Sequence, residues 1–296
     1  MSAPISEIVP AAAQGPRTAF ADVLRRILRD PLGALGAPLV LRFVLSAVLA
    51  PWIAPYEPNA LDVPARLQGP SGAHPLGTDN LGRDVLSRVL YGGRIALAVA
   101  LTAVGLALAG GVVLGLIAGY GPRWLDNVLL LLFDSVRAFP VVMFALAVIT
   151  VVGPSLQTVI LVVVVTSVPQ YARIIRTQTM SLRHTEFILA ERALGAGALR
   201  VLLVHILPNV IGPLMILASM EIPVVITIEA GLSFLGLGVR PPTPSWGNIL
   251  NDGYAFIRNT PWLVIAGGTP VVLTTLGFTF LGETLRDVFD PRLRRD

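Results

Sequence analysis

One compact group of residues has a spacing that could support acid–base chemistry. Asp79 and Asp84 alternate with Arg83 and Arg88 in a stretch rich in glycine. A pair of carboxylates can act as general acid and general base in hydrolysis. No activated nucleophile or metal-binding cluster can be recognised beside them, and acids alternating with arginines favour a salt-bridged helix at a membrane interface over a hydrolytic site.

Several reactive side chains are absent from the chain altogether. It contains no cysteine, and all 22 of its basic residues are arginines. A P-loop requires lysine and thiolate chemistry requires cysteine, so the sequence predicts neither ATP hydrolysis by this chain nor a thiolate site. The histidines lie in separate segments, where His74 is interpreted as a turn or surface residue and His205 as a hydrogen-bonded residue at a helix end. We therefore expect no cofactor, no metal and no enzymatic activity.

A few charged residues fall inside long apolar segments, where charge is costly and marks function or pairing. Asp134 and Arg137 stand at positions i and i+3, so they either neutralise each other or belong to a path through the membrane. Arg42 lies far from both ends of its segment, which makes snorkelling difficult and predicts that it faces a partner chain or an acid.

Glu221 and Glu229 lie eight residues apart, roughly 12 Å along a helix, near the expected midplane and outer face of the membrane. Two interpretations are open. Glu221 pairs with an arginine, such as Arg42 or one of a partner chain, or it faces a passage whose outer gate includes Glu229. The candidate path and gate residues are Glu221, Glu229, Ser233, Phe234, Asp134 and Arg137.

The elements that position these residues are membrane-spanning helices. The chain has 296 residues, 54% hydrophobic and only 14% charged, with a mean hydropathy of +0.74. Continuous apolar runs indicate helices rather than the alternating strands of a barrel. An all-α polytopic protein with six spans is predicted, at about 32–54, 95–120, 128–152, 155–171, 206–236 and 262–283. The glycines of the second span should permit close helix packing.

Arginine counts predict the orientation of the chain. With the N-terminus inside, fourteen arginines fall in inner segments and six in outer ones, which places both termini in the cytoplasm. The cytoplasmic tails are then 1–31, of which 1–16 is expected to be disordered, and 284–296. The basic excess follows from this topology, so we expect membrane lipid and no nucleic acid as a partner.

The inner connection 172–205 carries two helical patterns. Thr185 is a plausible N-cap, the next residues are strongly apolar, and Gly195 is a natural helix end. A second helix is expected from Ala198 to Leu207, ended by Pro208. A helix this apolar in a cytoplasmic loop must be covered, either by the protein's own bundle or by a separate soluble protein.

The run from Phe187 to Gly195 and on to Asn209 resembles the cytoplasmic coupling motif of binding-protein-dependent ABC importer permeases. Gly195, Leu207 and Pro208 match that motif, whereas Leu189, Glu191 and His205 replace its usual residues. The resemblance implies that these residues contact an ATPase: Phe187, Leu189, Ala190, Glu191, Arg192, Ala193, Leu194, Gly195, His205 and Pro208.

Three other blocks resemble the C-type permease subunit of dipeptide, oligopeptide and nickel ABC importers. They are 74–94, 229–247 and 285–292, so the resemblance covers about residues 20–295. Thr279 and Glu283 replace the usual Asn and Asp of that family before the last block.

The resemblance implies a type I ABC importer permease fold in the cytoplasmic (inner) membrane. Its partners would be a second homologous permease subunit, two cytoplasmic ATPase subunits that use ATP and Mg, and an extracytoplasmic substrate-binding protein. The chain would translocate dipeptides or oligopeptides by alternating access. The alternatives are a nickel importer permease, a stand-alone secondary transporter, which should show inverted repeats, and an intramembrane hydrolase, which should show a positioned nucleophile and base.

Overall fold

The computed structural model describes residues 25–258 and 260–289, and its regular elements are helices. The expected tail 1–16 and the last residues, 290–296, lie outside the described part. The long helices are α2 (Pro31–Ile53), α3 (Val85–Tyr120), α6 (Leu156–Leu182), α9 (Leu207–Phe234) and α11 (Pro261–Phe289). The shorter elements are η1 (Val63–Ala65), α4 (Arg123–Arg137), α5 (Val141–Val152), α7 (Glu186–Ala193), α8 (Ala198–Arg200), η2 (Val201–Ile206) and α10 (Trp246–Ala255).

The structure confirms the all-α polytopic prediction. Five helices are long and apolar enough to cross a membrane, and the bent pair of α4 and α5 brings the number to six. Three helices extend well beyond their expected spans: α3 begins at Val85 rather than at 95, α6 runs on to Leu182 rather than ending at 171, and α11 runs on to Phe289 rather than ending at 283. An apolar run in the sequence marks only the part of a helix that can lie in the hydrocarbon of the membrane. The helix itself continues to its capping residue, outside that part. For α3 that cap is Asp84, whose side chain accepts the Ser87 amide.

The third expected span, 128–152, is not one straight helix. It is broken into α4 and α5, which meet at an angle of 90° across a short turn. Pro140 lies in that turn and has no amide hydrogen to continue the helical ladder. Its ring also disfavours helical geometry at Phe139, the preceding residue. Hydropathy averaged over the whole segment did not reveal this break, because most of its residues, including Phe139 and Val141 next to Pro140, are apolar.

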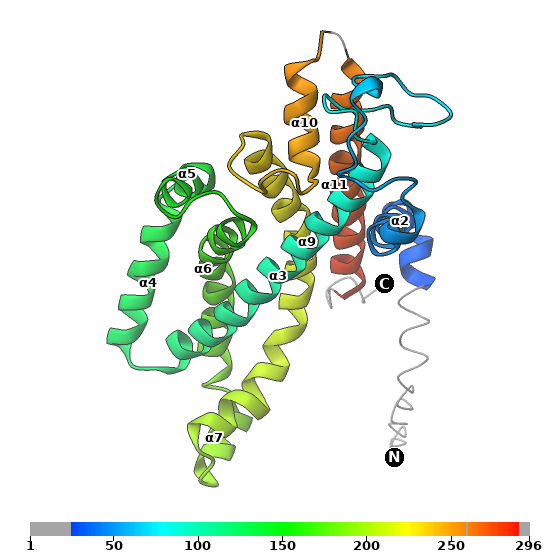
Figure 1. Cartoon of the computed structure of the whole chain (residues 1–296). Coiled ribbons are helices and arrows are strands. Elements are labelled where there is room, and N and C mark those ends of the chain that lie inside the picture. Colours follow the sequence, from blue (N-terminus) through cyan, green and yellow to red (C-terminus); the bar gives the residue numbers. More distant parts are fainter. Residues whose placement is uncertain (1–24, 259, 290–296) are drawn as a thin grey trace, which may run out of the picture.

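Close packing through glycine organises the middle of the molecule. α3 crosses the molecule diagonally, with α2, α10 and α11 beside its first half and α6 along its second half (Figure 1). Side chains of α6 and its backbone lie directly against Gly111, Gly115 and Gly119; a Cβ on Gly115 would stand 2.6 Å from the Ala172 carbonyl oxygen. The predicted role of these three glycines is confirmed, whereas Gly105 faces open space.

The connection 237–261 contains the helix α10, which the sequence did not predict. Ser245 begins it by accepting the Asn248 amide, at 3.2 Å. Trp246 is buried and donates from Nε1 to the Val89 carbonyl oxygen of α3, at 2.8 Å. α10 therefore lies against α3, α9 and α11 at the end of the molecule opposite α7 (Figure 1).

Candidate functional site

The helix α7 is a short helix at one end of the molecule, and its C-terminal end is closed by a well-defined cap. Gly195, just beyond it, has a left-handed backbone (φ 88°), a conformation that favours glycine. The Gly195 amide donates to the Arg192 carbonyl oxygen and the Ala196 amide to that of Glu191, both at 3.0 Å. This pair of bonds is a Schellman motif. The helix end that the sequence predicted at Gly195 is thus present.

One buried side chain anchors α7. Ile188 is fully buried and belongs to the same apolar core as Val201 and Ile206 of η2. Glu191 faces His205 of η2, with 3.6 Å between Glu191 Oε2 and His205 Nε2. Thr185 precedes the helix as expected, but its hydroxyl donates to the Leu182 carbonyl oxygen instead of capping α7.

The expected helix end at Pro208 is wrong. α8, η2 and α9 form one continuous helical path from Ala198 to Phe234. In a regular α-helix the Pro208 ring would collide with the Val204 carbonyl group. The π-helical turn of η2 widens the helix there, with the Leu207 amide donating to the Leu202 carbonyl oxygen. The Asn209 side chain also donates to the His205 carbonyl oxygen, at 2.6 Å.

Most of the predicted coupling residues lie on the surface. Phe187 is 46% exposed, Leu189 48% and Leu194 84%. Ala190, Arg192, Ala193, Gly195 and Pro208 are also exposed, whereas Glu191 and His205 are half-buried. The second helical segment adds Leu199 and Leu203, both exposed. This end of the molecule therefore exposes several large apolar side chains, which are defined here together as the α7 surface: Phe187, Leu189, Leu194, Leu199 and Leu203.

Inside the bundle, Glu221 lies between α9 and α6. Its Oε1 accepts a hydrogen bond from the Ser167 hydroxyl group of α6, at 2.9 Å, and the residue is half-buried. Tyr171, one turn further along α6, is fully buried, and its hydroxyl group has no hydrogen-bond partner among the described residues. Pairing of Glu221 with Arg42 is not found: Arg42 is exposed on α2, away from this contact.

Glu229 has a different environment near the end of α9. It is fully buried and accepts the Ser233 hydroxyl group at 2.7 Å, while Ser233 Oγ accepts the Val239 amide at 3.1 Å. Phe234 packs edge-on against Tyr254 of α10, with 5.9 Å between ring centroids. These contacts fix the turn that follows α9 against the bundle.

Asp134 and Arg137 do not pair with each other. Asp134 forms an ion pair with Arg173 of α6, and Asp126, two turns earlier on α4, pairs with Arg176. Arg137 is exposed at the end of α4. The two ion pairs attach α4 to α6, a contact between distant segments that spacing within one helix could not predict.

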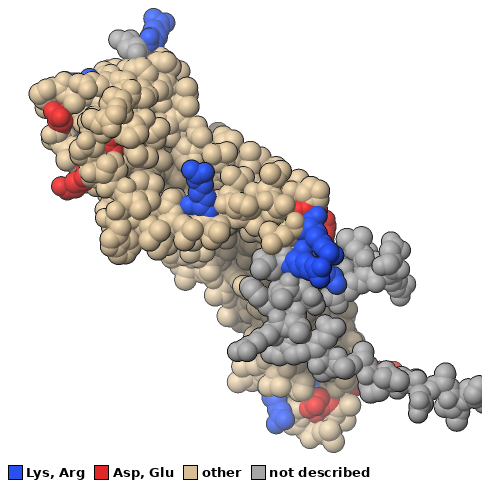
Figure 2. All heavy atoms as spheres, turned by 90° about the vertical axis from the view of Figure 1, so that its right-hand side faces the viewer, with Lys and Arg blue, Asp and Glu red and all other residues tan. Residues whose placement is uncertain are grey.

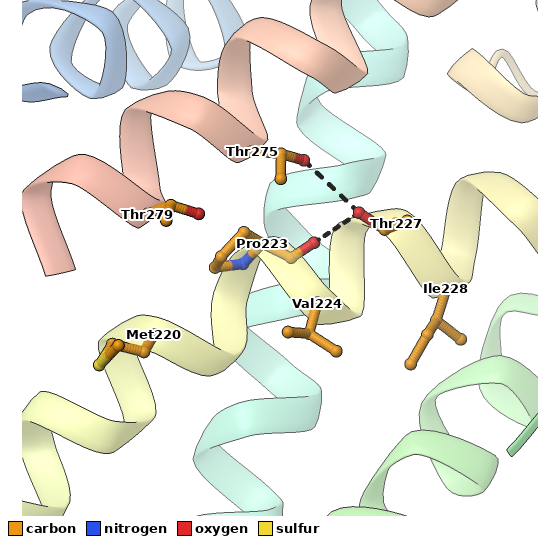
Figure 3. A pocket seen from close by; sticks show the side chains of 7 residues that line it. All are labelled: Met220, Pro223, Val224, Thr227, Ile228, Thr275 and Thr279. Carbon is orange, nitrogen blue, oxygen red and sulfur yellow. Dashed lines mark hydrogen bonds between the residues drawn. The ribbon is translucent and has the colours of Figure 1, made fainter. Parts of the chain in front are cut away.

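A groove of about 320 Å³ runs between α9 and α11. Its lining combines apolar side chains with three threonines: Met220, Pro223, Val224, Ile228, Thr227, Thr275 and Thr279. Figure 3 shows the Thr227 hydroxyl group between the Pro223 carbonyl oxygen, at 2.9 Å, and the Thr275 hydroxyl group, at 3.5 Å. Met220 and Pro223 of the groove are close to Glu221 in the sequence, but the groove lies on the α11 side of α9. Of its lining residues, only Thr279 was named from the sequence alone.

Buried charges occupy the opposite end of the molecule, beside α10. Arg83 Nε lies 2.6 Å from Asp79 Oδ2, Arg83 Nη2 lies 3.4 Å from Asp252 of α10, and Arg88 Nε lies 3.5 Å from Asp79 Oδ2. His74 Nδ1 lies 2.9 Å from Asp84 Oδ1. The salt-bridged interpretation of this stretch is confirmed, although residues 74–84 form turns rather than a helix. Among the described residues, no cluster of three or more acids or histidines is arranged to hold a metal ion.

Comparisons with known proteins agree with this geometry. Residues 111–295 match the family described as binding-protein-dependent transport system inner membrane component, and residues 18–70 match the N-terminal TM domain of oligopeptide transport permease C. The dipeptide transport system permease protein DppC of Alkalihalophilus pseudofirmus is 38% identical, over 92% of this chain and 90% of the relative. The di/tripeptide transport system permease protein DppC of Pseudomonas aeruginosa is also 38% identical, over 88% and 89%.

A third relative, the glutathione transport system permease protein GsiD of Pectobacterium atrosepticum, is 37% identical over 94% of this chain and 93% of its own length. Among solved structures, a chain of the MetNI methionine ABC transporter in an inward-facing conformation superposes with a TM-score of 0.55 at 18% identity. That match covers 69% of this chain and 97% of the other, and it shows a shared fold.

Proposed function

Since the chain belongs to the family of binding-protein-dependent transport system inner membrane components, we propose that it is the permease subunit of an ATP-driven importer of dipeptides or oligopeptides. It is a multi-pass protein of the inner membrane. The peptide substrate is supported by relatives named for dipeptide, di/tripeptide and glutathione transport. A second permease chain, two ATPase subunits that use ATP and Mg, and a binding protein complete the proposed assembly, which works by alternating access.

The observation that carries this proposal is the α7 surface. Phe187, Leu189 and Leu194 are exposed on a helix whose end is fixed by Gly195 and whose inner side is anchored by Ile188. An exposed apolar patch held in one orientation is typical of a protein-binding surface. The proposed occupant is a cytoplasmic ATPase subunit, whose movement α7 transmits to α6 and to the continuous helix that begins at Ala198.

We place the substrate path along α9. Its middle carries Glu221 on the α6 side and the threonine-lined groove on the α11 side. Polar groups therefore lie at mid-membrane depth, on a helix that also contains Pro213 and Pro223. Glu229, Ser233 and Phe234 fix the turn at its outer end, which is the proposed gate. Asp134 and Arg137 of α4 are the remaining candidates for the path or its gate, and the ion pair of Asp134 with Arg173 joins α4 to α6.

The test is uptake by the full importer in liposomes, with ATP inside and binding protein outside. Uptake of labelled dipeptide that requires ATP supports the proposal, whereas uptake of radioactive nickel without peptide uptake supports the nickel alternative and contradicts it. The purified chain alone should hydrolyse no ATP, because it lacks lysine and therefore a P-loop.

Glu221→Gln tests the path within the same assay. The amide keeps a hydrogen-bond partner for Ser167 and removes the ionisable carboxyl group, so the assembled importer should keep its yield and lose most peptide uptake. Glu283→Gln, at an exposed acid near the end of α11, is the matched control and should transport like the wild type. If Glu221→Leu also assembles and transports like the wild type, Glu221 does not face the path.

A further inference from the structure

Arg42 occupies the middle of α2. It lies eleven residues from Pro31 and eleven from Ile53, the two ends of the helix, so roughly 16 Å of helix separates it from either end. Its side chain is exposed rather than packed in the bundle. A permanently charged group therefore stands on the surface of a transmembrane helix, close to the expected centre of the bilayer.

The surface around Arg42 is apolar and hollowed. A groove of about 510 Å³ is lined by Pro38, Leu41, Arg42, Leu45, Ser46, Leu49, Ile53 and Leu90. The only hydroxyl group in this lining, that of Ser46, already donates to the Phe43 carbonyl oxygen at 2.8 Å. Figure 2 shows the side of the molecule that carries α2: its described surface is mostly uncharged, with scattered basic and acidic side chains. Within residues 25–258 and 260–289, no acid forms an ion pair with Arg42.

Lipid is a poor environment for this group. A charged side chain at the bilayer centre costs several kcal/mol unless it is paired or reaches water. The arginine stem is too short to bring the guanidinium group across roughly 16 Å to either interface. For the same reason an anionic lipid headgroup cannot come within hydrogen-bond distance of Arg42.

A second copy of this chain offers no suitable acid among its described residues. Asp126 and Asp134 of α4 are paired with arginines of α6, Glu221 is bonded to Ser167, and Glu229 is fully buried. The remaining acids of α11 lie in its last two turns, at the end of the bundle where Thr284 donates to Asp30. Charge complementarity therefore requires a carboxylate from a different membrane chain.

We propose that the groove around Arg42 binds a transmembrane helix of the second permease chain, and that this helix carries an Asp or Glu at mid-membrane depth whose carboxylate pairs with Arg42. The choice of the second permease chain rests on the proposed function. The leucines of the groove surround the pair and exclude lipid and water. The ion pair therefore fixes the depth at which the two helices meet and disfavours a wrong partner, because any other helix would leave the arginine unpaired.

The test uses the tagged full-length chain co-expressed with its second permease chain. Arg42→Leu should lower the amount of partner that co-purifies in detergent by roughly three- to twentyfold, the range for polar contacts between membrane helices. Arg42→Lys should retain most of the partner. Arg123→Leu, at an exposed arginine at the start of α4, is the control for loss of charge and should not alter recovery. Combining Arg42→Glu with Lys at the partner's mid-span acid should restore assembly.

Equal recovery of the partner with wild type and Arg42→Leu overturns the proposal. Loss with Arg42→Glu but not with Arg42→Leu also overturns it, because a carboxylate in lipid is costly in itself. If the wild-type chain neither co-purifies with the second permease chain nor imports peptide, the proposed function has failed. If it does both and Arg42→Leu does too, only the pairing of Arg42 has failed.

A second variant leaves Arg42 unchanged, so this test remains valid even if the Arg42 variants do not fold. The chain has no cysteine, so Leu45→Cys introduces a single thiol into the groove. Oxidation should join it to a cysteine placed one turn from the partner's mid-span acid. The absence of that disulfide for every acid in the partner's spans contradicts the proposal, as does a disulfide between two copies of Leu45→Cys.

Discussion

The two ends of this molecule are built in opposite ways. At the α10 end, charged residues are buried: Arg88 is 1% exposed and Asp79 3%, and both are part of one cluster of ion pairs. At the α7 end, apolar residues are exposed, and Leu194 is 84% accessible. The α10 end pairs its buried charges with one another, whereas the α7 end leaves apolar surface that the described residues do not cover.

The difference indicates that only the α7 end needs a partner protein to cover it. A turn region locked by internal ion pairs keeps its shape whether or not a partner is present. An exposed apolar helix gains free energy only when a partner covers it. We therefore expect substitutions in the ion pairs of the α10 end to lower the stability of the protein. Substitutions on the α7 surface should instead weaken the binding of a partner.

The largest expected effect is at Asp79. Asp79→Ala leaves Arg83 and Arg88 buried without their shared carboxylate, and it removes the acceptor of the Leu81 amide. Breaking a buried ion pair in this way should lower the free energy of unfolding by about 3–5 kcal/mol. Denaturant unfolding in detergent, followed by tryptophan fluorescence, measures it. The control is Glu57→Ala, at an exposed acid in the same connection between α2 and α3, which should change stability by about 0.5 kcal/mol or less. If both variants change stability equally, the cluster of ion pairs does not stabilise this end.

A smaller, local effect is expected at Ile188. Ile188→Asp places a carboxylate in the buried contact between α7 and η2, so α7 should detach at a cost of about 2–4 kcal/mol while the spans stay folded. Hydrogen exchange should then increase in residues 186–200 and nowhere else. Leu189→Asp, on the exposed side of the same helix, should leave exchange unchanged. Faster exchange throughout the bundle would show that α7 is part of the core rather than a separate docking element.

The smallest effect is expected at Asp252 of the α10 end. Burial raises the pKa of its carboxyl group, and the Arg83 guanidinium only partly offsets this. A carboxyl group whose pKa is higher in the folded state stabilises the fold at low pH, and that contribution is lost as the pH rises above its unfolded value near 3.8. Asp252→Asn should remove this decline and change stability at neutral pH by about 1 kcal/mol or less. Unfolding midpoints measured from pH 4 to pH 7 give the result; a loss as large as that of Asp79→Ala would contradict the ranking.

Much of this architecture could be predicted from the sequence, for identifiable reasons. Long apolar runs located five of the helices, and Gly195 marked the end of α7, because both signals are local. Pro140 also lies at a real break, but hydropathy averaged over a window concealed it. At Pro208 the sequence predicted a helix end, and this prediction is wrong because a π-helical turn accommodates the proline ring and the helix continues.

The contacts between distant segments were beyond sequence reasoning. Asp134 pairs with Arg173 rather than with Arg137, three residues away, because the bend at Pro140 and the course of α6 decide which charges meet. The same holds for Glu221, whose hydrogen bond comes from Ser167, 54 positions earlier in the chain. Spacing along one helix predicts which residues share a face, but not what lies opposite that face.

The central claim is that the α7 surface docks on an ATPase subunit. Leu194→Asp places a charge on its most exposed apolar residue, and Gly195→Pro removes the left-handed backbone that ends the helix. The direct measurement is the amount of ATPase that co-purifies with each variant from membranes, together with peptide uptake. Both variants should insert like the wild type, lose most of the bound ATPase and lose uptake. ATPase binding and uptake equal to those of the wild type in both variants would contradict the docking assignment.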